Sequence, residues 1–222
     1  MKKIYAVNGS PRNNFNTAKV LQSALDGAAS AGAETELIQL GNLKYSPCRS
    51  CMLCKRKDSN SAGRCAIQDD LTPILDKLRA ADGIIMGSPV YFGNVSGYFR
   101  SFMERFYFSL LRYSDPPASQ LERPIPTGMI YTMNIPQSAM QEMHYYEELG
   151  RINDFSAMLL KCGKVETLYV CDTFQFTDYS LYEADLFDPA HKAAMRETLF
   201  PQDCAKAFEL GRKIAAKCLK AE

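Results

Sequence analysis

Five short apolar runs alternate with longer stretches whose apolar residues recur at helical spacing, and few folds accommodate that alternation. Strands that alternate with helices form a parallel sheet joined by right-handed crossovers. The apolar runs cover residues 4–7, 34–40, 83–88, 127–133 and 165–171. The helical stretches cover residues 15–31, a helix that begins after Asp69-Asp70 with Pro73 in its first turn, 95–111, 138–161 and 190–219. We therefore predict an α/β fold, a doubly wound five-stranded parallel sheet with helices on both faces.

Three further segments set the expected organisation. Gly83–Ser88 is almost wholly apolar, which is typical of a central parallel strand buried on both faces. Residues 113–126 are rich in proline and serine and predict a loop. Pro201 interrupts the last helical stretch, so we expect two helical pieces there. One hydrophobic core suffices for 222 residues, and we predict a single domain over residues 1–222.

The charge balance narrows the class of partner. The chain has 26 Lys and Arg against 25 Asp and Glu, a formal net charge of +1. It therefore lacks the basic field expected of a protein that binds nucleic acid or an anionic membrane. No apolar run approaches the roughly 18 residues of a spanning helix, and the N-terminal run is too short for a signal peptide. We expect a cytoplasmic protein whose partners are small molecules or another protein.

The loop after the first run is rich in hydrogen-bond donors. It combines Gly9, the hydroxyls of Ser10 and Thr17, the Arg12 guanidinium and the Asn16 amide with the start of a helix. Ligands of doubly wound sheets bind outside the carboxyl ends of the strands, and a helix N-terminus attracts phosphate. The loop lacks the patterns of dinucleotide and triphosphate binders, which favours a monophosphate such as FMN. The alternative is an ordinary polar turn in which Ser or Asn caps the helix.

The loop after the third run supplies flat and rigid groups. Pro89, Val90, Tyr91 and Phe92 precede Gly93, and Asn94 follows it. A flavin ring is a flat apolar body with polar edges, so it suits such a loop. Tyr91 and Phe92 are otherwise explained as plain packing residues.

The two loops together resemble the NADPH-dependent FMN reductase-like branch of the flavodoxin superfamily. The resemblance rests on Gly9-Ser10-Pro11-Arg12 with Asn16-Thr17, and on Ser88-Pro89-Val90-Tyr91. It implies a flavodoxin-like fold with FMN at the switch point between the first and third strands. The phosphate contacts that it implies are Ser10, Arg12, Asn16 and Thr17; the ring contacts are Pro89, Val90, Tyr91, Phe92 and Asn94. Where family members often carry a glycine-rich stretch after the fourth strand, this chain departs with Thr132-Met133-Asn134, and we add Thr132 as a candidate contact.

Four cysteines fall within one loop, residues 45–66. Cys48, Cys51 and Cys54 are each three residues apart, and Cys65 follows. Four thiolates at this density suit a metal ion or an iron–sulfur cluster. The pattern resembles the iron–sulfur flavoproteins, which implies a 4Fe–4S cluster beside FMN, although the gap before Cys65 is longer than usual there. A structural zinc and free thiols are the two alternatives.

An aromatic segment, residues 169–187, precedes the last helical stretch within the C-terminal extension at 172–222. Aromatic residues concentrate in the cores of protein interfaces. One hypothesis is that this segment covers the flavin of a neighbouring subunit or forms a dimer surface, in a homodimer or homotetramer.

Flavin chemistry belongs to the cofactor, so no side chain is assigned as general acid or base. We expect an FMN-dependent oxidoreductase that takes electrons from NAD(P)H or a reduced protein and passes them to a quinone, a flavin or another acceptor. An iron–sulfur flavoprotein that relays electrons between protein partners, such as a ferredoxin-like protein, is the alternative. A flavin-binding sensor or scaffold is a third.

Overall fold

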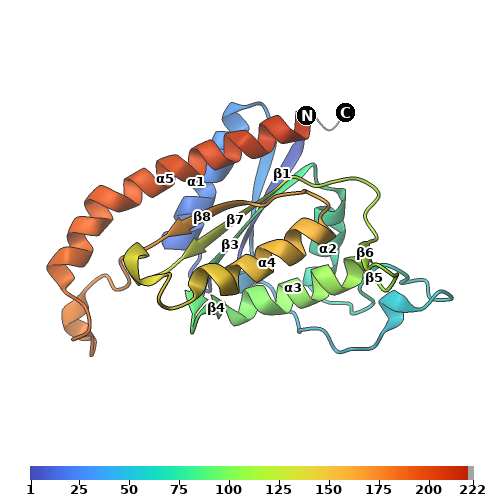
Figure 1. The fold of residues 1–222 in the computed structure, drawn as a ribbon, viewed down its shortest axis with the longest axis horizontal. Coiled ribbons are helices and arrows are strands. Elements are labelled where there is room, and N and C mark those ends of the chain that lie inside the picture. Colours follow the sequence, from blue (N-terminus) through green and yellow to red (C-terminus); the bar gives the residue numbers. More distant parts are fainter. Residues whose placement is uncertain (220–222) are drawn as a thin grey trace.

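A computed structural model describes residues 1–219 and has helices on both faces of a central sheet (Figure 1). The strands are β1 Lys3–Asn8, β2 Glu34–Gln39, β3 Gly83–Tyr91, β4 Asn94–Val95, β5 Leu111–Arg112, β6 Ala118–Ser119, β7 Thr127–Thr132 and β8 Glu166–Val170. The α-helices are α1 Asn16–Ser30, α2 Leu71–Ala80, α3 Gly97–Leu110, α4 Tyr145–Leu159 and α5 Pro189–Leu219. Four short 3₁₀ helices are η1 Leu40–Asn42, η2 Leu53–Lys55, η3 Gln137–Ala139 and η4 Tyr179–Leu181.

Five strands pair in parallel in the order β2-β1-β3-β7-β8, and the short β4 pairs antiparallel with the end of β3. The order reverses at β1, because β2 lies on one side of it and β3 on the other. In register, Asn8 of β1 pairs with Gly87 of β3, and Pro89 of β3 pairs with Thr132 of β7. The predicted doubly wound parallel sheet is confirmed, and the carboxyl ends of β1, β3 and β7 meet at one edge.

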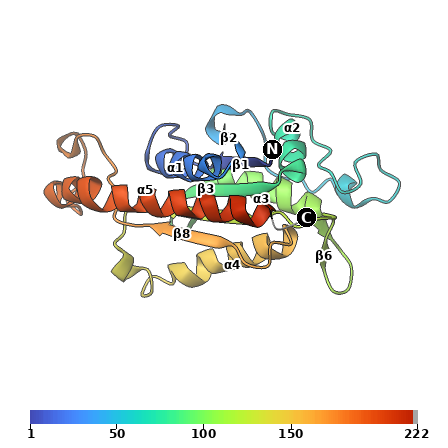
Figure 2. The ribbon, with the colours of Figure 1, turned by 90° about the horizontal axis from the view of Figure 1, so that it is seen from above.

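The helices form two layers (Figures 1 and 2). α2, α3 and α4 bury their apolar residues with one face of the sheet, and α1 and α5 with the other. Helices α1 and α5 lie very close together. A Cβ atom on Gly27 would lie 1.9 Å from the carbonyl oxygen of Phe208, and one on Gly211 would lie 1.8 Å from that of Ala24. Only glycine permits this backbone-to-backbone contact.

The prediction of two helical pieces around Pro201 was wrong, because α5 continues through this residue. A proline inside a helix removes one hydrogen bond and costs about 3 kcal/mol or more. Pro201 is exposed, whereas Ala207, Leu210 and Ile214 beyond it are buried in the core shared with α1. Burial of about 1.5–3 kcal/mol per large apolar side chain offsets the loss at the proline.

Two other segments differ from the expected boundaries. The helix expected at 138–161 begins only at Tyr145, because His144 before it has a positive φ of 56° and ends the preceding turn. The expected loop at 113–126 contains β6, which forms a small antiparallel hairpin with β5. Within residues 1–219, no helix has the length and apolar character required to cross a membrane.

Candidate functional site

A pocket of about 450 Å³ opens where the carboxyl ends of β1, β3 and β7 meet. Its volume falls in the range of about 300–1,000 Å³ that small-molecule sites occupy. Nine of the ten predicted contacts line it: Ser10, Arg12, Asn16, Thr17, Pro89, Val90, Tyr91, Phe92 and Thr132. The remaining lining residues are Phe15, Met133, Asn134, Thr173, Phe174, Gln175 and Leu186.

The first loop is folded by bonds among its own residues and to β2. Asn8 Oδ1 accepts a hydrogen bond from Ser10 N at 3.0 Å, and Ser10 Oγ accepts one from Arg12 N at 3.1 Å. Asn8 Nδ2 donates to Gln39 Oε1 at 2.6 Å. The backbone N–H of Gly9 donates to the carbonyl of Gly87, which ties the loop to β3. These bonds hold the loop beside the third-strand loop.

The start of α1 faces this pocket without a side-chain cap. Phe15 occupies the N-cap position and makes no capping bond. An ordinary turn capped by Ser or Asn, the alternative for this loop, is therefore not what the structure contains. Asn16 and Thr17, the first two residues of the helix, both line the pocket. An uncapped helix N-terminus offers free N–H groups and a partial positive charge to an anion.

Arg12 supplies a full positive charge at the same end of the pocket. Its guanidinium carbon lies 3.8 Å from the centroid of the Phe15 ring, and its Nη1 donates to the Gln175 carbonyl at 2.8 Å. These contacts fix the position of the Arg12 side chain, which lines the pocket.

The third-strand loop contributes apolar groups to the pocket that Arg12 also lines. Phe92 and Gly93 form the tight turn between β3 and β4, with φ values of 51° and 76°. Phe92 is fully exposed and Tyr91 is 42% exposed, so neither is explained by core packing. Asn94 is the one predicted contact that does not line the pocket. Its Oδ1 accepts a hydrogen bond from Val95 N at 2.8 Å.

Sequence reasoning missed the contacts from Thr173, Phe174 and Gln175. They belong to the aromatic segment that we expect to cover the flavin of a neighbouring subunit or to form a dimer surface, and they line the pocket of their own chain. Asn16 Nδ2 donates to the Phe174 carbonyl at 2.7 Å, which holds the segment against α1. Its concentration of aromatic residues was the only signal in the sequence.

Asn134 is a further residue for which no role was assigned. Its Nδ2 donates to Gln175 Oε1 at 2.5 Å, while its buried Oδ1 has no hydrogen-bond partner in the described part of the chain. A buried acceptor without a partner costs about 1–3 kcal/mol. Because Asn134 lines the pocket, a ligand donor there would satisfy it.

A buried ion pair fixes the segments around Asn134. Lys192 Nζ donates to Asp172 Oδ1 at 2.5 Å and to the Asn134 carbonyl at 2.8 Å, and His191 Nε2 lies 2.7 Å from Asp172 Oδ2. Burial acts to raise the pKa of Asp172, but the hydrogen bonds from Lys192 and His191 outweigh it and keep this pKa below its usual value. The pair joins α5 to the ends of β7 and β8.

The four clustered cysteines lie around a second, small cavity. Cys48, Cys51, Cys54 and Cys65 line it together with Arg105 of α3. Burial raises the pKa of the Cys54 thiol, while Lys55 acts in the opposite direction. In the described range 1–219, no three or more His, Cys, Asp or Glu side chains have the geometry of a metal site. The loop therefore gathers four thiols, the donor set of an iron–sulfur cluster, around one cavity, although their sulfur atoms are not drawn together as they would be around a bound metal ion.

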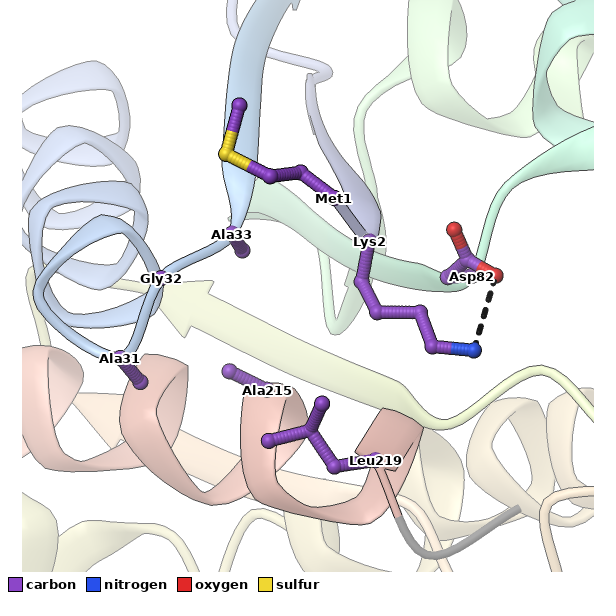
Figure 3. A pocket seen from close by; sticks show the side chains of 8 residues that line it. All are labelled: Met1, Lys2, Ala31, Gly32, Ala33, Asp82, Ala215 and Leu219. Carbon is purple, nitrogen blue, oxygen red and sulfur yellow. Dashed lines mark ion pairs between the residues drawn. The ribbon is translucent and has the colours of Figure 1, made fainter. Parts of the chain in front are cut away.

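A third hollow lies at the opposite edge of the sheet (Figure 3). It is bordered by Met1, Ala33 and Leu219 and by the ion pair of Lys2 with Asp82, whose atoms lie 3.9 Å apart. It is removed from the carboxyl ends of the strands, where ligands of this fold bind.

The family follows from a comparison with known proteins. Residues 2–121, more than half of the chain, match the model of the NADPH-dependent FMN reductase family. The chain belongs to this family. The resemblance of the first- and third-strand loops to this family is thereby confirmed.

The curated relatives that it matches carry a second description. An iron–sulfur flavoprotein of Methanocaldococcus jannaschii is 44% identical over 103 residues, which are 46% of this chain and 51% of the relative. An iron–sulfur flavoprotein of Methanosarcina thermophila is 38% identical over the same shares of the two chains. The chain thus spans about half the length of the curated relatives it matches.

Solved structures agree with the fold over nearly the whole chain. The NAD(P)H:quinone oxidoreductase from Methanothermobacter marburgensis has a TM-score of 0.70 at 13% identity, covering 95% of this chain and 98% of that one. The FMN-dependent NADH-azoreductase from Bacillus anthracis, in complex with FMN, has a TM-score of 0.62 at 12% identity, covering 100% of both. At these identities the likeness shows the fold, and the predicted flavodoxin-like fold is confirmed.

Proposed function

We propose that this protein binds FMN in the pocket at the ends of β1, β3 and β7. We propose further that it is an FMN-dependent oxidoreductase, which takes electrons from NAD(P)H or a reduced protein and passes them to a quinone, a flavin or another acceptor. One observation carries this proposal: the uncapped N-terminus of α1 and the exposed aromatic side chains of Tyr91 and Phe92 line the same pocket.

The phosphate end of FMN fits the first loop. Ser10 and Thr17 present hydroxyls, Asn16 presents an amide, and Arg12 presents a guanidinium. The free N–H groups at the start of α1 add further donors and a favourable dipole. Charge-assisted hydrogen bonds of this kind are about twice as strong as neutral ones.

The ring end fits the third- and fourth-strand loops. Pro89, Val90 and Tyr91 offer apolar surface to a flat ring. The unpartnered Oδ1 of Asn134 is an acceptor suited to an N–H on the polar edge of a flavin. Bound FMN supplies hydride and single-electron transfer, and the side chains around it bind, orient and restrict water. No side chain of the pocket is assigned as acid or base.

A titration of free FMN with the protein tests the binding proposal. Flavin fluorescence is expected to change to a plateau at one FMN per chain, most simply by quenching. Saturating protein with no effect on fluorescence would sink it. Oxidation of NAD(P)H by the loaded protein with an added quinone tests the enzyme proposal. Binding without turnover by any donor would instead favour a sensor or scaffold.

A second candidate function is that of an iron–sulfur flavoprotein that relays single electrons between protein partners, such as a ferredoxin-like protein. It is favoured by the gathering of four cysteines around one cavity. Cys48, Cys51, Cys54 and Cys65 would hold a 4Fe–4S cluster, as four thiolates commonly do. Iron and sulfide analysis of protein purified without oxygen tests this. Zinc alone would assign a structural metal, and protein with neither metal would leave free thiols.

The oligomeric state belongs to the same proposal. Leu181, Tyr182 and Leu186 of the aromatic segment are largely exposed. Exposed apolar groups of this kind favour a homodimer or homotetramer. Light scattering at micromolar concentration tests it, and a monomer saturated with FMN would contradict it.

A further inference from the structure

Arg105 of α3 is a large charged side chain with only 1% of its surface exposed. Charged residues are rarely buried so completely unless all their groups are paired. Its Nε donates a hydrogen bond to Cys65 Sγ at 2.8 Å. Cys65 is one of the four cysteines around the cavity, so the guanidinium contacts a sulfur of the candidate metal site directly.

The other guanidinium nitrogens join the two ends of the cysteine loop. Nη1 donates to the Ser46 carbonyl at 3.0 Å, two residues before Cys48. Nη2 donates to the Ile67 carbonyl at 3.3 Å, two residues after Cys65. The Arg105 side chain therefore ties both ends of the cysteine loop to α3, the helix from which Arg105 lines the cavity.

Asp69 balances the buried charge. Its carboxylate oxygens lie 2.8 Å from Nη1 and 3.1 Å from Nη2 of Arg105, a fork-to-fork pair. Asp69 also accepts from the backbone N–H groups of Ser46 and Leu71. Burial acts to raise the Asp69 pKa, but the bonds from Arg105 and the backbone outweigh it and keep this pKa below its usual value. Arg105 and Asp69 thus form a compact network of charge-assisted hydrogen bonds, which we call the brace of the cysteine loop.

We propose that Arg105 is the positioning residue of the cysteine site, holding Cys65 at the cavity and donating an N–H to its sulfur. The part of this inference that concerns a bound cluster rests on the second candidate function above. Hydrogen bonds to the sulfurs of an iron–sulfur cluster stabilise its reduced, more negative state and so raise its potential. Lysine cannot replace arginine here, because a point charge cannot make the planar set of bonds to sulfur, carbonyls and carboxylate.

The chain offers a matched control. Arg79 of α2 braces the same loop by donating to the Gly63 carbonyl at 2.7 Å, but none of its hydrogen bonds goes to a thiol in the described residues. Arg105→Lys and Arg79→Lys are therefore the same change at two braces of one loop, of which only the first contacts sulfur.

The experiment compares wild type, R105K and R79K, with circular dichroism to verify folding. In metal-loaded protein, R105K is expected to lower the one-electron reduction potential of the cluster by about 59 mV, which corresponds to a tenfold shift of the equilibrium toward the oxidised state. R79K is expected to leave the potential unchanged. Equal potentials in R105K and wild type, or equal shifts in R105K and R79K, would overturn the proposal. Should R105K fail to fold, Arg105→Gln also removes the N–H donor to Cys65 and is expected to lower the potential as well; an unchanged potential in R105Q would then overturn the proposal.

Hydrogen exchange of the metal-free chain separates this inference from the proposed cluster. Wild-type protein that takes up no iron would refute the proposed cluster, and hydrogen exchange alone would then test the positioning role of Arg105. In R105K the amides of Ser46 and Leu71, which donate to Asp69, are expected to exchange about tenfold faster. In R79K they are expected to exchange as in wild type. Unchanged exchange in R105K would contradict the positioning role.

Discussion

The hydroxyl oxygens of Thr17 and Thr132 lie 2.7 Å apart in the buried floor of the pocket, and one donates a hydrogen bond to the other. Thr17 is the second residue of α1, and Thr132 is the last residue of β7. The bond therefore sets the distance between the proposed phosphate loop and the fourth-strand loop. Replacing Thr17 with valine keeps its shape and removes both this bond and the hydroxyl that we propose as a phosphate donor. We expect T17V to weaken FMN binding about tenfold to a hundredfold, the effect of losing a bond to a charged group worth about 1.5–3 kcal/mol.

Thr132→Val is the control for T17V, because it removes the bond between the loops and leaves the hydroxyl of Thr17. We expect T132V to weaken FMN binding less than T17V does. Fluorescence titration measures both. Equal losses would show that Thr17 acts only through Thr132.

Arg12 should distinguish FMN from riboflavin, which lacks the phosphate. We expect Arg12→Ala to weaken FMN binding about tenfold to a hundredfold, because a charge-assisted pair is lost. Riboflavin binding should be nearly unchanged. Parallel titrations with the two flavins measure this, and a matching loss for riboflavin would mean that Arg12 contacts the ring or only braces Gln175.

Gly9 has no room for a side chain. A Cβ atom there would lie 2.6 Å from Cβ of the buried Phe99. We expect Gly9→Ala to lower the free energy of unfolding by about 1–3 kcal/mol, the usual cost of overpacking. Gly150 of α4 is the control, since a Cβ there meets nothing within 4 Å. Gly150→Ala should be neutral or stabilise by up to about 1 kcal/mol, because alanine is the better helix former. Urea unfolding measures both, and equal effects would exclude the clash.

Asp172 should make stability depend on pH in acid. Its pKa is lowered in the folded state, so its contribution is present above the usual value of 3.8 and is lost as the pH falls through the folded value. At pH 6, Asp172→Asn should destabilise by about 3–5 kcal/mol, because it leaves Lys192 buried without its partner. The difference in unfolding free energy between D172N and wild type should become smaller as the pH falls below 3.8. Unfolding free energies at several pH values measure this, and a constant gap would contradict it.

Local periodicity and loop chemistry were enough to predict the sheet and most of the pocket. The apolar run Gly83–Ser88 predicted the central strand, because a strand buried on both faces needs no polar alternation. The loops at Ser10–Thr17 and Pro89–Phe92 were found because the carboxyl ends of neighbouring parallel strands must meet at one edge. These inferences need only residues that are close together in the chain.

Only the tertiary structure decided the rest. Gln175 reaches Arg12 across 163 positions of the chain, and Arg105 reaches Cys65 across 40. The helix α5 passes through Pro201 because burial against α1 outweighs one lost hydrogen bond. Such contacts depend on how faces pack and how charges are paired once water is excluded, which no local pattern encodes. The sequence thus determined the helices and strands and the end of the sheet at which their loops gather, while tertiary packing determined which side chains contact one another.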